Sequence, residues 1–211
     1  LGVNLDEDIA YRIGRAFAQI LASQKNDSQG NESLENSIVI GCDIRDSSEM
    51  LKQATIRGII DAGVDVIDLG MTGTEEVYFG TSHYNALGGI EVTASHNPIN
   101  YNGLKLVREG SRPISADSGL AEIQALAEQG DFAASTQAGK VVERFDKTAY
   151  VDHLMSFIDT DKLVPLKIVI NSGNGSAGPV VDLLIEQLAQ AGAPIEVIKL
   201  HHTPDGSFPN G

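Results

Sequence analysis

One loop carries the densest set of side chains that could do chemistry. It runs from Thr93 to Lys105 and reads TASHNPINYNGLK. It follows a strand-like apolar stretch and leads into another, and α/β proteins bind ligands in loops at the carboxyl ends of such strands. Ser95 is the hydroxyl of this loop that has a possible charge partner beside it, His96. The loop could also be a plain turn, because Ser and Asn-Pro favour turns and Lys105 would then be a solvated strand residue.

The surroundings of Ser95 favour phosphoryl chemistry over ester or peptide hydrolysis. A serine hydrolase would need glycines at positions 93 and 97 for the G-x-S-x-G elbow, where this chain has Thr93 and Asn97. A triad also takes its histidine from elsewhere in the fold, whereas His96 is the next residue in the chain. A phosphate on this serine would add about −1.5 to −2 charge and would need nearby cations and amide donors. His96, Asn97 and Lys105 could supply them.

The elements around the loop alternate between two types. Strand-like segments cover residues 37–42, 64–69, 88–93 and 103–107. Amphipathic helices are predicted over residues 4–22, 48–62, 74–85 and 117–129. This alternation predicts an α/β domain over residues 1–144, with a mixed, mostly parallel sheet sandwiched by helices.

The first predicted helix has a recognisable start and a polar end. Asn4 and Glu7 have the spacing of a capping box. After the helix, residues 23–36 read SQKNDSQGNESLEN, which predicts a long, disordered loop.

A second, incomplete α/β domain is predicted over residues 145–211. Residues 139–145 have the pattern of an edge strand or connector, and residues 147–158 that of a helix. The strand, helix and strand that follow form one βαβ unit, with bounds at residues 166–171, 177–190 and 195–200. One such unit cannot cover both faces of a sheet, so we expect it to open a domain similar to the first.

Composition and charge exclude several classes of protein. The 211 residues are 42% hydrophobic and 21% charged, as in a globular chain. A net charge of −14 disfavours nucleic acid and membrane surfaces as partners, although a local basic pocket could still bind a small anion. The single cysteine requires no oxidising compartment, and no apolar run approaches about 18 residues, so we expect a cytoplasmic protein. The oligomeric state stays open.

At the serine loop the sequence resembles a known family. The hexapeptide TASHNP at residues 93–98, with NGLK after it, is closely similar to the phosphoserine loop of the α-D-phosphohexomutases, which include phosphomannomutases and phosphoglucomutases. Residues 41–48 resemble the family's first strand and turn. Residues 70–79, 89–93 and 105–110 are most similar to bacterial phosphomannomutases of the nucleotide-sugar pathway. The likeness covers nearly the whole chain and is more specific for the family than for mannose.

The resemblance implies an isomerase that interconverts hexose 6-phosphate and hexose 1-phosphate, with mannose phosphates as the favoured pair. Phosphorylated Ser95 would give its phosphate to the sugar, form a hexose 1,6-bisphosphate and receive the other phosphate back. Lys105 would move the proton of the sugar hydroxyl. His96 and Asn97 would orient the phosphate, and Asn102 would help to bind it. The phosphate on Ser95 would also share a Mg²⁺ with an Asp-rich loop.

The family pattern further predicts that the chain is a fragment. The chain starts on Leu1 and stops at Gly211, within a run of residues that favour turns. The family's Y-D-I-R-G segment would precede Leu1, and its D-G-D-x-D-R metal loop would follow Gly211. The remaining Mg²⁺ ligands are therefore expected beyond Gly211, and the chain alone is expected to be inactive.

Dinucleotide binding is the alternative function. The run GNGSAG from Gly173 to Gly178 lies between a predicted strand and a predicted helix and matches G-x-G-x-x-G, a pattern that places a pyrophosphate at a helix N-terminus. The acidic residue expected at the end of the next strand is missing, because Glu196 is near its start and Lys199 near its end. A tight strand-to-helix turn would explain the glycines without any ligand.

Two other polar sets have simpler interpretations. His201 and His202 are adjacent, would point to opposite sides of an extended segment, and are interpreted as loop residues rather than metal ligands. Asp43, Arg45 and Asp46 form a charge cluster after a strand, which we interpret as structural support behind the site.

Overall fold

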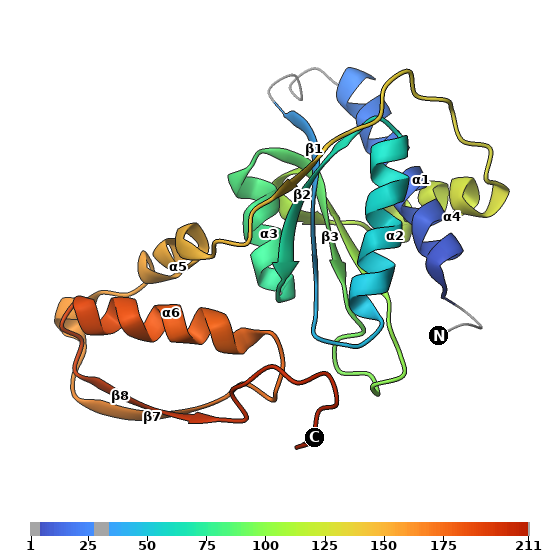
Figure 1. Cartoon of the computed structure of the whole chain (residues 1–211). Helices are drawn as coiled ribbons and strands as arrows, with labels where there is room; N and C mark the ends of the chain where they lie inside the picture. The colour runs from blue at the N-terminus through green and yellow to red at the C-terminus, as the bar shows by residue number, and fades with distance from the viewer. Residues whose placement is uncertain (1–4, 28–33, 211) are drawn as a thin grey trace. The chain divides into compact units, whose positions relative to one another are not determined.

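The computed structural model describes residues 5–27 and 34–210 (Figure 1). The chain divides into two units, Leu1–Phe145 and Asp146–Gly211. The serine loop belongs to the first unit, and the glycine-rich turn belongs to the second.

A mixed six-stranded sheet forms the centre of the first unit. In chain order the unit contains α1 (Glu7–Asp27), β1 (Glu35–Cys42), α2 (Ser48–Asp61), β2 (Asp65–Met71), α3 (Thr74–His83), β3 (Ala86–Val92), β4 (Leu104–Arg108), β5 (Arg112–Pro113), α4 (Leu120–Gln129) and β6 (Val141–Glu143). The strand order is β5-β4-β3-β1-β2-β6. Strands β1, β2, β3 and β6 run parallel, whereas β4 is antiparallel to both of its neighbours. The predicted mixed, mostly parallel sheet is confirmed.

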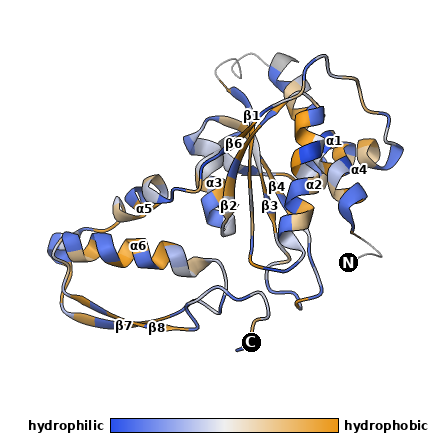
Figure 2. Ribbon diagram, viewed as in Figure 1, coloured by the Kyte–Doolittle hydropathy of each residue, from blue (hydrophilic) through white to orange (hydrophobic). Residues whose placement is uncertain are grey.

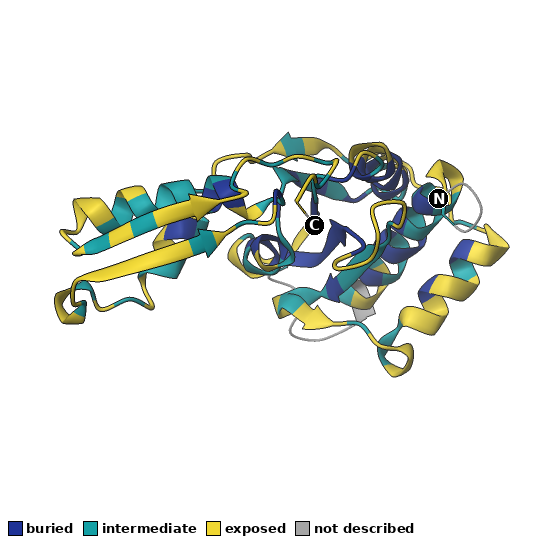
Figure 3. Ribbon diagram, turned by 90° about the horizontal axis from the view of Figure 1, so that it is seen from below, coloured by how far each residue is buried: buried dark blue, intermediate teal, exposed yellow. Residues whose placement is uncertain are grey.

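Helices cover both faces of this sheet. Helix α2 leads from β1 to β2, and α3 leads from β2 back past β1 to β3. Because β-α-β crossovers are right-handed, the change of direction places α2 and α3 on opposite faces. A large core around Phe17, Ile40 and Ile59 joins α1, α2 and α4 to one face, and a smaller core around Val39 and Val77 joins α3 to the other. Hydrophobic residues concentrate on the central strands, which are buried (Figures 2 and 3).

The start of α1 differs from the predicted capping box. The helix begins at Glu7, and the Asp6 carboxylate accepts a hydrogen bond from the amide of Ile9 at 2.9 Å. Asp6 therefore caps the first turn. The predicted cap, Asn4, lies outside the described residues.

The end of α1 corrects the predicted loop over residues 23–36. The helix continues to Asp27 and β1 begins at Glu35, so the prediction was wrong for residues 23–27 and 35–36, and residues 28–33 lie outside the described part. A helix that has already formed propagates easily through Gln24 and Lys25, which are good helix formers. Lys25 also bonds the carbonyl oxygen of Leu34, just before β1.

The predicted helix over residues 117–129 is shorter than expected. Gly119 takes a left-handed φ of 118°, which separates a short 3-10 turn, Ala116–Ser118, from α4. A glycine adopts this conformation without strain, so the chain breaks the helix there.

The second unit contains the predicted βαβ unit with the predicted bounds. It comprises α5 (Thr148–Met155), β7 (Leu166–Asn171), α6 (Ala177–Gln190) and β8 (Ile195–Leu200), and β7 pairs with β8 in parallel. Much of both strands is exposed (Figure 3). Their exposed large apolar side chains are those of Leu166, Ile168, Val169, Ile198 and Leu200. The two-stranded sheet of this unit therefore leaves apolar surface uncovered, as expected.

Candidate functional site

The loops that follow β1 and β3 meet at one edge of the sheet. At this point the chain changes direction across the sheet, from β1 outwards to β2 and then back to β3. Strands β1 and β3 are parallel neighbours, so the loops that follow them, residues 43–47 and 93–103, leave the same edge of the sheet. Ligands of open α/β sheets bind at such a switch point, outside the carboxyl ends of the strands. The first loop carries Arg45 and the second carries Ser95, and hydrogen bonds connect them directly.

The main chain of Ser95 is held on both sides. Its amide donates a hydrogen bond to Thr93 Oγ1 at 2.9 Å, and its carbonyl oxygen accepts one from Arg45 Nη2 at 3.0 Å. Its φ of +55° lies in the left-handed region, which a residue with a Cβ enters only when its surroundings impose it. The residue itself is exposed, so the fold presents its hydroxyl to solvent on a fixed backbone.

Arg45 binds the serine loop with both terminal nitrogens of its guanidinium group. The residue is 5% exposed. Its two terminal nitrogens donate hydrogen bonds at 2.8–3.3 Å to four main-chain carbonyl oxygens of the loop, those of Ser95, Asn97, Pro98 and Tyr101. Turns leave such carbonyls without helix or sheet partners, and a planar guanidinium can satisfy several at once. The loop is therefore closed around a buried arginine.

Asp43 orients this arginine and connects it to Thr93. The carboxylate of Asp43 accepts hydrogen bonds from Arg45 Nε at 3.1 Å, Thr93 Oγ1 at 2.7 Å and Ser48 Oγ at 2.5 Å. One carboxylate thus fixes both groups that hold the main chain of Ser95. Asp43 and Arg45 support the loop, as interpreted from the sequence, whereas Asp46 is exposed.

The two asparagines of the loop bind the loop itself. Asn97 Nδ2 donates to the carbonyl oxygen of Ala94 at 3.0 Å. Asn102 Nδ2 donates to the hydroxyls of Ser47 and Ser48 at 2.8 and 2.9 Å, and thereby ties the serine loop to the start of α2. These contacts engage their amide donors in the absence of a phosphate, and the roles expected of both residues in phosphate binding stay predictions.

The two candidate cations lie on different parts of the loop. His96 follows Ser95 directly and is exposed. Lys105 is half-buried in β4, and its Nζ donates a hydrogen bond to Thr74 Oγ1, at the start of α3, at 3.2 Å. The lysine is therefore held at the edge of the sheet from which the serine loop leaves.

Sequence reasoning assigned no role to Glu91, a buried carboxyl beside Lys105. Glu91 is 1% exposed and is the cross-strand partner of Lys105. Burial raises the pKa of its carboxyl well above the usual range, the carboxylates of Asp43 and Glu76 add to this rise, and a hydrogen bond from Thr72 and the Lys105 ammonium oppose it. The one available signal was a single acidic residue in the apolar strand run GGIEV.

Cys42 and the acidic side chains near the site are the candidates, within the described part of the chain, for a reactive thiol and a metal centre. Burial raises the pKa of the Cys42 thiol to about 12, which disfavours its reactive thiolate form. Among the described residues, no group of three or more His, Cys, Asp and Glu side chains could hold a metal ion. Helices long and apolar enough to cross a membrane are also absent from this part of the chain.

The glycine-rich turn of the second unit is packed against, and hydrogen-bonded to, the segment that follows β8. Asn174 is buried, its side chain donates to the carbonyl oxygen of Thr203 at 2.9 Å, and its amide donates to that of His201 at 2.7 Å. A Cβ on Gly178 would lie 2.2 Å from the carbonyl oxygen of His202, so close packing requires this glycine. Dinucleotide binding at the turn is therefore not supported.

The adjacent histidines have different surroundings. The His202 ring bonds Ser172 Oγ at 3.3 Å and Asp182 Oδ1 at 2.9 Å, while His201 is exposed. These contacts tie the end of β8 to β7 and α6. They agree with the interpretation of the pair as loop residues.

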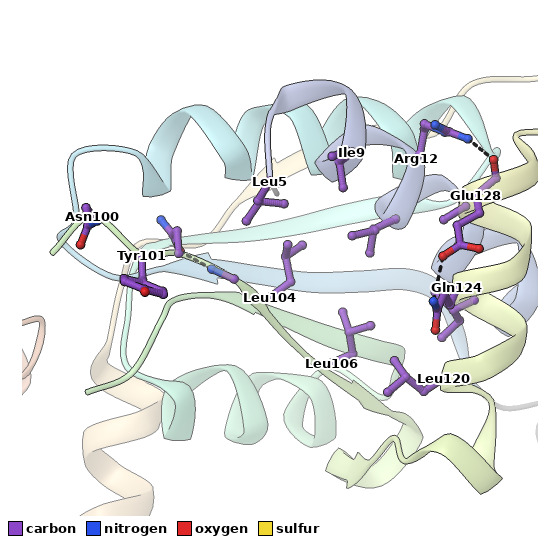
Figure 4. A pocket seen from close by; sticks show the side chains of 15 residues that line it. Leu5, Ile9, Arg12, Asn100, Tyr101, Leu104, Leu106, Leu120, Gln124 and Glu128 are labelled. Atoms are coloured by element: carbon purple, nitrogen blue, oxygen red, sulfur yellow. Dashed lines mark hydrogen bonds between the residues drawn. The ribbon is translucent and has the colours of Figure 1, made fainter. Parts of the chain in front are cut away.

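A large cavity of about 1110 Å³ lies between α1, α4, β4 and the end of the serine loop from Asn100 to Gly103 (Figure 4). Its apolar lining includes Leu5, Ile9, Ile13, Leu104, Leu106, Leu120 and Ile123. Ser95, His96 and Lys105 do not line it. Polar residues line it as well, namely Arg12, Asn100, Asn102, Gln124 and Glu128, but most of the lining is apolar, whereas a phosphorylated sugar needs several cations and hydrogen-bond partners.

Comparison with known proteins gives consistent matches along the chain. Residues 1–134 match the family "Phosphoglucomutase/phosphomannomutase, alpha/beta/alpha domain I", and residues 148–211 match its domain II. Curated relatives named "Phosphomannomutase" include those of Salmonella montevideo, 54% identical, and Vibrio cholerae serotype O1, 53% identical. Both matches cover 100% of this chain and 44% of the relative. The chain thus spans less than half the length of these relatives.

Solved structures show the same architecture. A phosphoglucomutase/phosphomannomutase family protein of Burkholderia thailandensis is 32% identical, with a TM-score of 0.83 over 100% of this chain and 43% of that protein. A putative phosphomannomutase of Thermus thermophilus, 22% identical, shares the fold with a TM-score of 0.76 over 98% of this chain and 44% of that one. With both domain descriptions matched along most of its length, the chain belongs to the phosphoglucomutase/phosphomannomutase family.

Proposed function

We propose that the protein containing this chain is a phosphohexomutase that interconverts mannose 6-phosphate and mannose 1-phosphate. The observation that carries this proposal is Ser95, an exposed hydroxyl on a main chain held in the left-handed region by Arg45 and Thr93. Family membership and relatives named phosphomannomutase support the reaction and the sugar. The proposal concerns the whole protein, because the chain spans 44% of those relatives.

The proposed reaction consumes no net phosphate. In the first half, the P–O bond of phosphorylated Ser95 breaks while the free hydroxyl oxygen of the hexose phosphate forms a bond to phosphorus, and the hydroxyl proton ends on the departing Ser95 Oγ. The product is a hexose 1,6-bisphosphate, which turns over in the site. In the second half, the other P–O bond of the sugar breaks while Ser95 Oγ bonds to that phosphorus, and the proton of the Ser95 hydroxyl ends on the released sugar oxygen. Preorganisation of the accepting atom is the main contribution that a protein makes to such a transfer.

The other residues of the loop have proposed roles that follow from their positions. As the neutral amine, Lys105 Nζ accepts the proton of the attacking sugar hydroxyl, and as the ammonium it gives a proton to the leaving sugar oxygen. His96 stands next to Ser95 and would help to neutralise its phosphate. Asn97 and Asn102 keep the loop in shape, and we propose that they also bind phosphate. Arg45 cannot serve as a direct phosphate ligand in this conformation, because carbonyl oxygens already occupy its terminal nitrogens.

Mg²⁺ and hexose 1,6-bisphosphate are the proposed cofactor and activator. The described residues do not by themselves form a metal site. A phosphate on Ser95 would supply oxygen ligands that Mg²⁺ prefers, and the remaining ligands would come from sequence beyond Gly211. Bound there, the ion would neutralise charge on the moving phosphoryl group.

The substrate is the partner that this site predicts. A net charge of −14 argues against nucleic acid and anionic membranes, and we place the enzyme in the cytoplasm. The product, a hexose 1-phosphate, is the form that a nucleotidyltransferase would consume to make a nucleotide sugar.

Steady-state assays of a full-length protein, one that includes this chain at the length of its relatives, test the proposal. We expect conversion of mannose 1-phosphate to mannose 6-phosphate that depends on Mg²⁺ and is stimulated by the bisphosphate. Glucose 1-phosphate, assayed in parallel, should give a lower kcat/KM. Absence of any hexose phosphate conversion by a folded, phosphorylated protein would refute the proposed function.

A further inference from the structure

Glu91 and Lys105 lie side by side in the sheet. Glu91 of β3 is paired with Lys105 of β4 and, on its other side, with Gly41 of β1. Directly opposed residues of antiparallel strands point to the same face, with Cβ atoms about 4.5–5.5 Å apart. The two side chains therefore share the face covered by α3, at the edge that carries the serine loop.

Thr72 reaches Glu91 because position 41 has no side chain. Thr72 Oγ1 donates a hydrogen bond to Glu91 Oε2 at 2.7 Å. A Cβ on Gly41 would lie 2.0 Å from that hydroxyl oxygen. Three strands thus contribute to one arrangement: a glycine in β1, a hydroxyl after β2 and a carboxyl in β3.

This carboxyl is energetically unfavourable for the fold. Glu91 is 1% exposed and faces the carboxylates of Asp43, after β1, and Glu76, in α3. The charge of Glu91 also raises the pKa of the Cys42 thiol of β1, and the Lys105 ammonium of β4 lowers the pKa of Glu91. A well-packed apolar residue in such a place is often neutral or stabilising. A costly polar group retained beside a candidate catalytic residue indicates a functional role.

We propose that Glu91 is a positioning residue for Lys105, an inference that rests on the proposed mutase function. In its ionised form Glu91 attracts the Lys105 ammonium from the sheet side, and Thr74 Oγ1 accepts a hydrogen bond from Nζ at 3.2 Å from the helix side. Together they keep Nζ at the edge of the sheet instead of in solvent. Glu91 does not contact the substrate and acts through Lys105.

Glu91→Gln in the full-length protein is the sharpest test. The amide keeps the shape of the side chain and can still accept the hydrogen bond of Thr72, but it carries no charge. At a pH high enough for Glu91 to ionise, we expect kcat to fall about 10-fold, because small displacements of a catalytic group are costly, while KM changes less than about twofold. We expect Tm to rise, because a buried carboxyl is gone. A variant that is more stable and slower is not the outcome of a purely structural role.

A double-mutant cycle shows whether Glu91 acts through Lys105. If it does, Glu91→Gln combined with Lys105→Ala should be no slower than Lys105→Ala alone. Asp68→Asn is the matched control, because Asp68 is a buried carboxyl that pairs with Lys52 at 3.1 Å rather than with Lys105. This control should lower Tm and leave kcat unchanged.

Several outcomes would overturn the inference. The first is an unchanged kcat in Glu91→Gln. The second is a double variant whose loss of kcat equals the product of the losses in the two single variants. If the glutamine variant does not fold, Glu91→Met takes its place, and failure of both to fold would show that Glu91 is structural. A wild type without mutase activity would refute the proposed function and this inference together, whereas an active wild type that tolerates Glu91→Gln would refute only the inference.

Discussion

The guanidinium group of Arg45 donates a hydrogen bond to the carbonyl oxygen of Ser95 at 3.0 Å, across 50 positions of sequence. Three further carbonyl oxygens of the same loop accept hydrogen bonds from this group. The amide of Ser95 is held separately by Thr93. The backbone of the proposed phosphate carrier is therefore fixed by residues of this chain before any ligand binds.

Arg45→Lys should loosen this loop. An ammonium lacks the planar fork of a guanidinium and cannot satisfy four carbonyl oxygens. A buried polar group left without its partner costs about 1–3 kcal/mol, so we expect the free energy of unfolding to fall by about that amount and turnover by about 10²-fold. Denaturant unfolding and steady-state kinetics measure the two effects. Arg57→Lys, on an exposed position of α2, is the control and should change neither.

Thr93 should matter through its hydroxyl group. Its Oγ1 accepts the amide hydrogen of Ser95 and donates to Asp43. Thr93→Val removes both hydrogen bonds with little change of shape, and we expect kcat to fall about 10-fold or more, the equivalent of one net hydrogen bond. Thr93→Ser keeps the hydroxyl and should restore most of the activity. Equal kinetics of the two variants would show that the hydroxyl does not hold Ser95 in place.

Lys105→Ala should slow the reaction without unfolding the protein. Loss of a general acid or base lowers turnover by about 10²-fold or more. Lys162→Ala, at a lysine whose side chain is 83% exposed, is the matched control and should leave kcat unchanged. Circular dichroism checks the fold of both variants. Normal turnover in Lys105→Ala would show that this lysine is a solvated strand residue without a catalytic role.

Glu91 should give the protein a pH-dependent loss of stability. Its folded pKa is raised, so its contribution to stability is fully present below the ordinary glutamate pKa and is lost as pH rises through the folded value. Glu91→Gln removes this titration. The free energy of unfolding of the variant minus that of wild type should therefore increase from about pH 5 upwards, by at most about 1.4 kcal/mol per pH unit. Urea unfolding at a series of pH values measures the difference, and a pH-independent difference would contradict it.

The elements were predictable where local pattern and packing agree. Strand β7, helix α6 and strand β8 have the predicted bounds, because each has a clear apolar pattern and turn residues at its ends. The last turns of α1 were not predictable in this way. Residues 23–27 show no apolar periodicity, although a helix formed upstream can propagate through them.

The residues of the serine loop could be predicted from the sequence, but the residues that support the loop could not. Ser95, His96 and Lys105 lie in one short motif, so their chemistry can be inferred from neighbours in the sequence. The carbonyl oxygens that Arg45 binds lie more than 50 positions away for most of its contacts, and composition could indicate only a supporting role. Glu91 receives its hydrogen bond from Thr72, 19 positions earlier and after a different strand. Such contacts depend on strand order, which the sequence pattern alone did not determine.

Transfer of a labelled phosphate tests the role of Ser95 most directly. The full-length protein is incubated with hexose 1,6-bisphosphate that carries labelled phosphate, the excess is removed, and the labelled peptide is identified by mass spectrometry. We expect the label on Ser95, and its release as hexose bisphosphate when mannose 1-phosphate is added. Ser95→Ala should keep the fold and take up no label. Label on Ser47 or Ser48 instead, or normal turnover in Ser95→Ala, would contradict a mechanism that proceeds through phosphorylated Ser95.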